Sequence, residues 1–371
     1  MLGEPGIFRK KLLRWYDRDR RDLPWRPPRA ARAADSQTSA AATIDPYHVL
    51  VSEAMLQQTQ VATVVPYFLR FLERFPTIAS LAAADEQEVL RLWQGLGYYS
   101  RARNLRSAAQ RVVAEHDGKL PTTAPRLLQL PGVGRYTAGA IASIAFGCRA
   151  PILDGNVMRV LCRLDKIESD PREKETQERL WRRAEEVLPA KRCGDFNSAL
   201  MELGATVCTP RSPKCLVCPV RDHCEAQSAG AQEQIPPARK TKPTPLFQRH
   251  VFCISRRDHY LIEQRPAKGR WAGMWQFVTL EAERTPGAAS TQLRIKLSPP
   301  RRIGTVTHAL THRRYTFEVY ACTVAGRAAN LSPRRWTRLD RLSDYPLPRP
   351  HLKIAELLRD LAPNAPVATA I

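Results

Sequence analysis

The sequence lacks the features that would place it at a membrane. No apolar run approaches the roughly 18 residues that a spanning helix needs, and the first residues contain no apolar core of the signal-peptide type. The arginine-rich stretch 7–22 carries three aspartates, whereas transit peptides are poor in acidic residues. We therefore expect a soluble, cytoplasmic protein with no membrane partner.

Acidic residues are scarce relative to basic ones. The 371 residues include 58 Lys and Arg against 36 Asp and Glu, which gives a formal charge of +22 and a pI near 10.1. The basic residues are spread along the chain, so the charge belongs to a surface rather than to a tail. Such a surface favours a polyanionic partner, with nucleic acid the first candidate, because each phosphate that binds Lys or Arg releases counterions.

The nine cysteines fall into two groups. Five lie apart from one another in apolar or strand-like surroundings, as buried thiols do in a reducing compartment: Cys148, Cys162, Cys193, Cys253 and Cys322. The other four follow the spacing C-x6-C-x2-C-x5-C: Cys208, Cys215, Cys218 and Cys224. Four thiolates this close together in a cytosolic-type protein indicate a metal site, and the spacing leaves both zinc and a [4Fe–4S] cluster open.

The stretch 130–164 combines a glycine turn with a carboxylate. Gly132 and Gly134 allow a sharp turn between two helices and a close approach of backbone N–H groups to a phosphate. The next helix, 136–147, is rich in small residues, and the loop after it carries Asp154. A plainer interpretation also fits, because such turns often only join helices and an aspartate before Gly-Asn often caps one.

The stretch 46–69 is apolar on almost every face and predicts a buried helix. Glu53 is its only formal charge, and a lone carboxylate there finds a partner or acquires a raised pKa. A raised pKa suits a general acid, whereas the alternative is a glutamate that reaches solvent or a buried arginine. Gln57 and Gln58 follow at the helix end, where their amides suit contacts with base edges.

Aromatic and basic side chains alternate after a second glycine turn, in WQGLGYYSRARNL. We expect the turn to expose Tyr98, with Arg101 and Arg103 holding phosphates nearby, and Tyr99 to pack beneath the loop. Further along, 226–248 is polar and rich in proline, as linkers are. The part beyond it predicts strands and a terminal helix, at 250–254, 259–264, 275–280, 315–324 and 351–361.

Two motifs, LPGVGRYTAGA and ILDGNVMRVL, closely resemble the helix-hairpin-helix and aspartate segments of the DNA glycosylases related to endonuclease III. Within that superfamily the chain is similar, over nearly its whole length, to the MutY-type adenine glycosylases. The resemblance implies a mainly α N-terminal helix-hairpin-helix glycosylase domain, 1–225, with an iron–sulfur module, 208–224, that holds a [4Fe–4S] cluster. An α+β MutT (Nudix)-like C-terminal domain, 249–361, and a tail, 362–371, follow the linker.

The resemblance also implies catalytic roles. Glu53, in the matching SExMLQQT motif, protonates the departing adenine; Asp154 stabilises the developing sugar cation, and Asn156 positions the acid or its water. Relatives that also cut the backbone carry a lysine where this chain has Tyr136, and a phenol forms no imine. Tyr136 is instead expected to donate a hydrogen bond or to steady the cation near the sugar. Some relatives carry another lysine at Met158. We therefore expect a monofunctional enzyme without lyase activity.

The resemblance implies DNA contacts at the duplex probe, the wedge and the hairpin: Gln57, Gln58, Tyr98, Gly132, Gly134 and Arg135. In relatives a Phe-Ser-His loop reads the oxidised guanine opposite the adenine, and here the matching residues are Leu310, Thr311 and His312. The acidic Nudix signature is missing after Phe277, so no Mg²⁺-dependent pyrophosphatase is expected.

The expected partner is double-stranded DNA with adenine opposite 8-oxoguanine or guanine, bound by a monomer at the nucleoid of a bacterial-type cell. One alternative is a related enzyme for another base, such as a thymine or oxidised pyrimidine opposite guanine. Another is a non-catalytic, cluster-bearing DNA-binding or redox-sensing protein. No role is assigned to 27–45, a stretch rich in Ala, Pro, Ser and Thr that we expect to be a surface loop.

Overall fold

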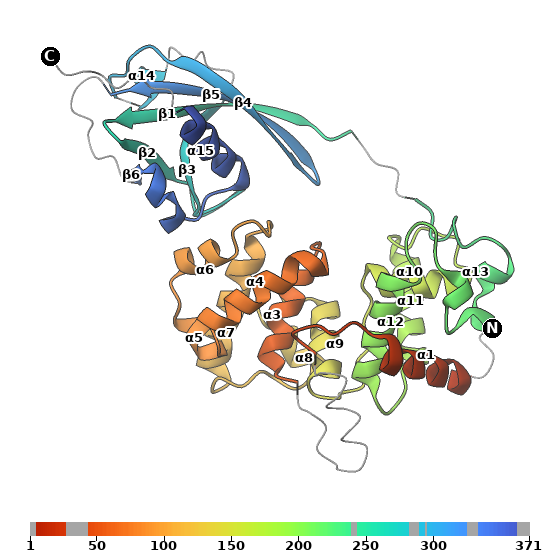
Figure 1. Cartoon of the computed structure of the whole chain (residues 1–371). Coiled ribbons are helices and arrows are strands. Elements are labelled where there is room, and N and C mark those ends of the chain that lie inside the picture. The colour runs from red at the N-terminus through yellow and green to blue at the C-terminus, as the bar shows by residue number, and fades with distance from the viewer. Residues whose placement is uncertain are drawn as a thin grey trace. The chain divides into compact units, whose positions relative to one another are not determined.

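The structure is a computed structural model (Figure 1). It describes residues 5–26, 44–238, 243–281, 289–293, 295–324 and 333–361. All but the last two residues of the expected surface loop, part of the expected linker and the whole expected tail lie outside these ranges. Backbone contacts divide the chain into two units, one of 1–84 with 100–240 and one of 85–99 with 241–371.

The first unit is helical, as predicted. Its helices are α1 (Pro5–Asp19), α3 (Pro46–Leu56), α4 (Val61–Arg74), α5 (Ile78–Ala83), α7 (Ser100–Glu115), α8 (Ala124–Leu127), α9 (Arg135–Ile144), α10 (Gly155–Leu164), α11 (Lys174–Val187), α12 (Cys193–Thr206) and α13 (Glu225–Ser228). Two short 3-10 helices lie in the cysteine loop, Cys215–Val217 and Arg221–His223. Apolar faces of α1, α10, α11 and α12 share one core.

The single helix predicted over 46–69 is wrong. The chain forms α3 and α4, separated by a turn in which Gln58 adopts a positive φ of 58°. No helix continues through a residue in that conformation. The apolar residues run on through both helices, so their periodicity shows no break.

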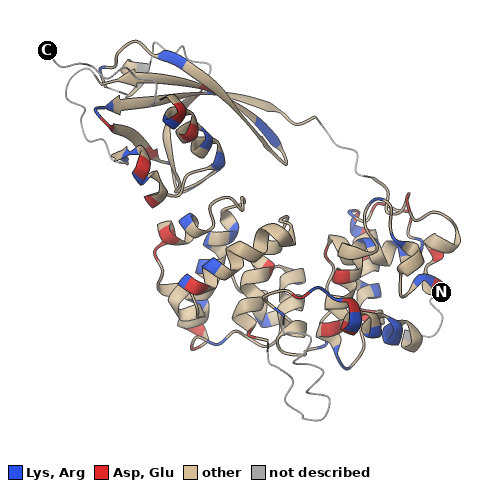
Figure 2. Ribbon diagram, viewed as in Figure 1, with Lys and Arg blue, Asp and Glu red and all other residues tan. Residues whose placement is uncertain are grey.

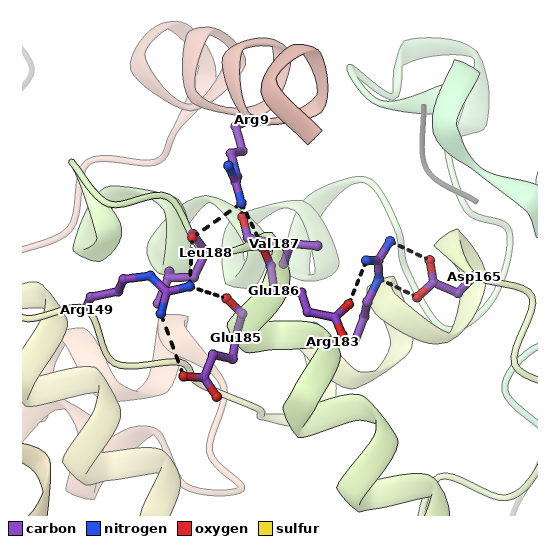
Figure 3. Close-up of polar contacts among 8 residues, drawn as sticks. All are labelled: Arg9, Arg149, Asp165, Arg183, Glu185, Glu186, Val187 and Leu188. Carbon is purple, nitrogen blue, oxygen red and sulfur yellow. Dashed lines mark hydrogen bonds and ion pairs between the residues drawn. The ribbon is translucent and has the colours of Figure 1, made fainter. Parts of the chain in front are cut away.

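A long helix in the first unit ends without a glycine. At the carboxyl end of α11, the Arg9 guanidinium donates to the carbonyls of Glu186 (2.7 Å) and Val187 (2.8 Å), and Arg149 donates to the carbonyl of Glu185 (2.7 Å) (Figure 3). The last carbonyls of a helix have no donor within it. These two arginines supply donors from outside α11.

The second unit contains one mixed sheet and confirms the α+β prediction. Its strands are β1 (Leu246–Arg256), β2 (His259–Gln264), β3 (Trp275–Glu281), β4 (Arg301–Leu310), β5 (Arg313–Thr323) and β6 (Arg334–Arg338), in the order β4-β5-β1-β3-β2-β6 with β1 and β5 parallel. The helices are α6 (Glu86–Leu92), α14 (Ala289–Leu293) and α15 (Arg349–Leu361). Successive residues of β1 enter two cores on opposite faces, one of them shared with α15 (Figure 1).

Helix α6 lies within the sequence predicted as glycosylase domain, yet its contacts group it with the second unit. Asp85 caps it by accepting from Gln87 N (2.8 Å). The Gln87 side chain donates to the Gly273 carbonyl (3.0 Å) and accepts from the Trp275 indole (3.1 Å). The domain boundary at residue 225 stays a prediction.

The charged residues and the apolar helices are distributed as the composition indicates. Lys and Arg are distributed over both units and interspersed with Asp and Glu (Figure 2). No helix in the part of the chain that the structure describes has the length and apolar character to cross a membrane. Among the five scattered cysteines, Cys148 is partly exposed and the other four are buried.

Candidate functional site

Glu53 lies on α3 in apolar surroundings, with 5% of its surface exposed. Its Oε2 atom has no hydrogen-bond partner among the described residues. Burial raises the pKa of the Glu53 carboxyl to about 7, and the negative charge of Asp154 adds to the rise, while the Tyr136 hydroxyl and the Arg26 cation oppose it. The carboxyl therefore holds a proton near neutral pH, as a general acid must.

Asp154 is both the cap of α10 and a neighbour of Glu53. Its Oδ1 accepts from the backbone N–H groups of Asn156 (3.0 Å) and Val157 (2.7 Å), and its Oδ2 accepts from the Asn156 amide (2.9 Å). Burial raises the pKa of the Asp154 carboxyl, although these hydrogen bonds oppose the rise. The plainer interpretation as a cap is thus correct, and the same carboxylate still acts on Glu53.

Small residues in α9 bring this loop close, as the sequence indicated. A Cβ added at Gly139 would lie 2.3 Å from the Pro151 carbonyl oxygen, so only glycine fits. Tyr136, in the first turn of α9, donates its hydroxyl to the Met201 thioether (3.2 Å). Burial and the nearby carboxylates raise the pKa of Tyr136 well above its usual value, so it stays a neutral phenol.

The structure adds a buried ion pair that sequence reasoning missed. Glu202 on α12 is 1% exposed and accepts from Arg21 (2.6 and 3.1 Å) and Arg26 (2.9 Å). Arg26 also lowers the pKa of Glu53, so the same cation acts on both carboxyl groups. The available signal was a lone glutamate in the otherwise apolar SALMELG run.

A second missed residue, Arg159, connects the aspartate loop to the cysteine loop. Its guanidinium donates to the Asn156 side-chain oxygen (2.9 Å), the Gly204 carbonyl (2.6 Å) and the Cys208 carbonyl (2.8 Å). A Cβ added at Gly204 would lie 2.6 Å from the Asn156 Cβ, so α12 packs closely against α10. The hydrogen-bonded series Asp154–Asn156–Arg159 therefore ends on the backbone of Cys208.

The four clustered cysteines line one pocket. Within the described ranges, no three His, Cys, Asp or Glu side chains gather tightly enough for a single metal ion. Buried Arg163 donates to the Cys208 Sγ (3.3 Å) and to the Thr209 carbonyl (2.7 Å), which fixes the loop. Four thiols around one pocket, with a cation beside one sulfur and no set of three ligands placed for a single ion among the described residues, fit an iron–sulfur cluster better than one zinc ion.

The glycine turn between α8 and α9 has the predicted shape. Gly132 has a φ of 75°, and a Cβ there would lie 2.6 Å from the Asn104 Cβ. Gly134 caps α9 without a side-chain hydrogen bond. The Arg135 guanidinium stacks on the Trp181 ring at 3.9 Å from its centroid.

The remaining predicted DNA contacts lie at turns. Gln57 and Gly132 line one pocket, and Gln58 stands in the left-handed turn after α3. Tyr98 is 44% exposed, and its hydroxyl is 2.5 Å from the Thr311 hydroxyl within the second unit. Tyr99 is buried, as expected.

Two residues in these segments correct or complete the sequence interpretation. Arg101 was expected to hold phosphates, but it is only 8% exposed and contacts backbone carbonyls. Leu310 ends β4 and packs against the core, while Thr311 and His312 form the exposed turn into β5. The turn itself is therefore presented to solvent, and the leucine anchors it.

Comparisons with known proteins agree with this arrangement. Residues 51–186 match the HhH-GPD superfamily of base excision DNA repair proteins, 250–357 match the NUDIX domain, and 208–224 match the iron–sulfur binding domain of endonuclease III. Human adenine DNA glycosylase is 39% identical over an alignment that covers 88% of this chain and 68% of the human protein. Adenine DNA glycosylase of Buchnera aphidicola subsp. Acyrthosiphon pisum is 31% identical over 94% of this chain and 97% of its own.

A solved structure of a thermostable thymine-DNA glycosylase aligns with a TM-score of 0.52 and 30% identity, covering 61% of this chain and 97% of that one. A helical unit with this hairpin and cysteine loop, joined to a NUDIX-type domain, defines a helix-hairpin-helix DNA glycosylase that carries a [4Fe–4S] cluster. The match of the cysteine loop decides against zinc. The chain belongs to the adenine DNA glycosylase family.

Proposed function

We propose that this enzyme removes adenine mispaired with 8-oxoguanine or guanine and leaves the DNA backbone intact. The observation that carries the proposal is the buried Glu53 carboxyl, with a pKa near 7, under the influence of the fixed Asp154 carboxylate. Two carboxyl groups in different environments suit two different roles, an acid and an anion.

In the proposed reaction, water hydrolyses the N-glycosidic bond of the adenine nucleotide. Glu53 gives its proton to a ring nitrogen of the extruded adenine, so the base departs neutral when the N-glycosidic bond breaks. The Asp154 carboxylate stabilises the positive charge that develops on the sugar, and water adds to the anomeric carbon and returns a proton to Glu53. Asn156 holds the Asp154 carboxylate in place. The Tyr136 phenol forms no imine, so no strand cleavage follows.

The proposal includes the DNA contacts. Gln57, Gln58 and Tyr98 would probe and wedge the duplex, and the hairpin with Gly132 and Gly134 would hold a phosphate. In the second unit, the turn formed by Thr311 and His312, supported by Leu310, would read the base opposite adenine. Support comes from the exposure of that turn and from the left-handed turns at Gln58 and Tyr98. We propose a monomer acting on chromosomal DNA, at the nucleoid in a bacterial cell.

The test uses purified protein and duplexes with one adenine opposite 8-oxoguanine, guanine, cytosine or thymine. We expect free adenine from the first two, with strand breaks only after alkali. Breaks without alkali would contradict the monofunctional mechanism. The Glu53→Gln variant serves as the catalytic control, because it keeps the side chain's shape but cannot act as the acid.

A second candidate activity has one observation in its favour. The similar thymine-DNA glycosylase structure covers 61% of this chain at 30% identity. A duplex with thymine opposite guanine therefore belongs in the same panel. The NUDIX-type domain at 250–357 favours adenine. Release of thymine and not adenine would overturn the primary proposal.

A further inference from the structure

Arg101 occupies an unusual place for an arginine in a basic DNA-binding protein. It lies in the first turn of α7 and is 8% exposed. Its Nη1 donates to the carbonyls of Ala54 (3.0 Å), Met55 (2.9 Å) and Gln57 (2.5 Å), and its Nη2 donates to the Thr59 hydroxyl (3.3 Å). One side chain therefore contacts four residues, two in the last turn of α3 and two in the connection to α4.

These carbonyls are the ones that a helix leaves without donors. Helix α3 ends at Leu56, and the residue after it, Gln57, is not a glycine and has extended ψ (φ −56°, ψ 109°). The last carbonyls of α3 thus lack the usual glycine cap. The guanidinium supplies the missing donors, and its positive charge complements the negative end of the helix dipole.

The same contacts lie next to two residues of the proposed site. Gln58 lies between Gln57 and Thr59, both of which the guanidinium holds, and it has the left-handed φ of 58°. Glu53 immediately precedes Ala54, the first of the bound carbonyls. A non-glycine residue keeps a left-handed backbone only where its surroundings determine it.

We propose that Arg101 is a positioning residue for adenine removal. It holds the Gln58 turn in the conformation that meets the duplex and fixes the helix end that carries Glu53. The inference rests on the proposed function, in which Gln58 probes DNA and Glu53 is the acid. Arg101 itself touches neither DNA nor the reacting atoms.

The experiment compares Arg101→Met and Arg101→Lys with Thr59→Val, which removes one of the four contacts. Arg9→Met is the matched control, because Arg9 also donates to the last carbonyls of a helix, but on α11 (Figure 3). For each variant we measure the unfolding temperature and the single-turnover rate of adenine release from a duplex with adenine opposite 8-oxoguanine. Base extrusion is measured by the fluorescence of 2-aminopurine in place of adenine, in a Glu53→Gln background.

We expect Arg101→Met to slow adenine release by about tenfold to a hundredfold and to reduce base extrusion, because a small displacement of a positioned group is costly. Arg101→Lys recovers part of both, since an ammonium group reaches fewer acceptors than a guanidinium. Thr59→Val has an effect of about two- to fivefold. Arg9→Met lowers the unfolding temperature but leaves the release rate of the folded protein unchanged.

Several outcomes would overturn the inference. If folded Arg101→Met releases adenine and extrudes the base as well as Arg9→Met does, Arg101 is only a helix cap. If Arg101→Met does not fold, Arg101→Lys and Thr59→Val decide, and unchanged rates in both reject the positioning role. If the wild type releases no adenine, the proposed function fails, and the extrusion measurement alone then tests the role of Arg101.

Discussion

Two buried glutamates, Glu53 on α3 and Glu202 on α12, differ in almost everything except residue type and exposure. They are 5% and 1% exposed. Burial raises the pKa of Glu53 to about 7, and one of its oxygens has no partner among the described residues. Burial alone would also raise the pKa of Glu202, but hydrogen bonds and charge from Arg21 and Arg26 outweigh it and hold that pKa below its usual range.

The difference shows that burial by itself does not make a general acid. A buried carboxyl with cationic donors on both oxygens stays ionised and acts as a structural ion pair. A buried carboxyl that lacks them keeps its proton near neutral pH and can deliver it. The chain contains both arrangements within one helical unit, so they can be compared directly by substitution.

The largest effect is expected from Glu53→Gln, which removes the proposed general acid. We expect the rate of adenine release to fall by about 10² to 10⁴, the contribution of a general acid, while the affinity for mispaired duplex is retained. In the wild type the rate declines as pH rises through about 7, because the protonated carboxyl is lost. Single-turnover rates across pH and a binding titration measure both. Equal loss from Glu202→Gln in a stably folded variant would contradict the division of roles.

Glu202→Gln tests the other side of the comparison. Glutamine keeps one acceptor oxygen but removes the negative charge and the second acceptor from Arg21 and Arg26. Because two cations then lack their counter-charge, we expect a loss of about 3 kcal/mol in the free energy of unfolding. We take the lower end of the range because the Arg21 side chain is 38% exposed. Since the folded pKa is depressed, this stability exists above the unfolded value of 4.5 and is lost as pH falls. Denaturant titrations at neutral and acidic pH should show the deficit shrinking below pH 4.5.

Glu53→Gln should have the opposite effect on stability. The folded pKa of Glu53 is raised, so the folded protein binds its proton more tightly and the wild type loses stability as pH rises from 4.5 to about 7. The variant avoids that loss and gains up to roughly 3 kcal/mol at pH 8, less the cost of burying an amide. Below pH 4 the two proteins should differ little. A variant no more stable than the wild type at pH 8 would show that the pKa of Glu53 is not raised in the folded protein.

The smallest expected effect comes from Arg26→Met, because Arg26 acts on both carboxyl groups. Its cation lowers the pKa of Glu53, so its removal should move the midpoint of the pH–rate profile upward by a fraction of a pH unit. The same substitution removes one donor from Glu202 and lowers the unfolding temperature. A downward shift of the midpoint would mean that Arg26 does not face the acid.

Local sequence signals predicted much of the site. Glu53 stood out as the only charge in an apolar helix, and burial is the largest cause of its raised pKa. The spacing of the four cysteines predicted a metal site. In each case the cause lies within a few residues of its effect, so the sequence contains it.

Features that depend on distant contacts were not predictable. The break at Gln58 depends on Arg101, some 43 positions further on, which caps α3 in place of a glycine. The ion pair of Arg26 and Glu202 joins residues 176 positions apart. Strands β4 and β6 were not predicted from the sequence. Each begins with two arginines and buries few side chains, so its alternation of apolar and polar residues is weak.

The hydrogen bonds by which Asp154 caps α10 also affect how much its surroundings must rearrange during the proposed reaction. Both of its oxygens already accept hydrogen bonds from N–H donors, which hold the carboxylate in one orientation. In the proposed reaction the anion therefore stabilises the cation with little reorganisation energy, because its dipolar surroundings are set during folding rather than at the moment of bond breaking.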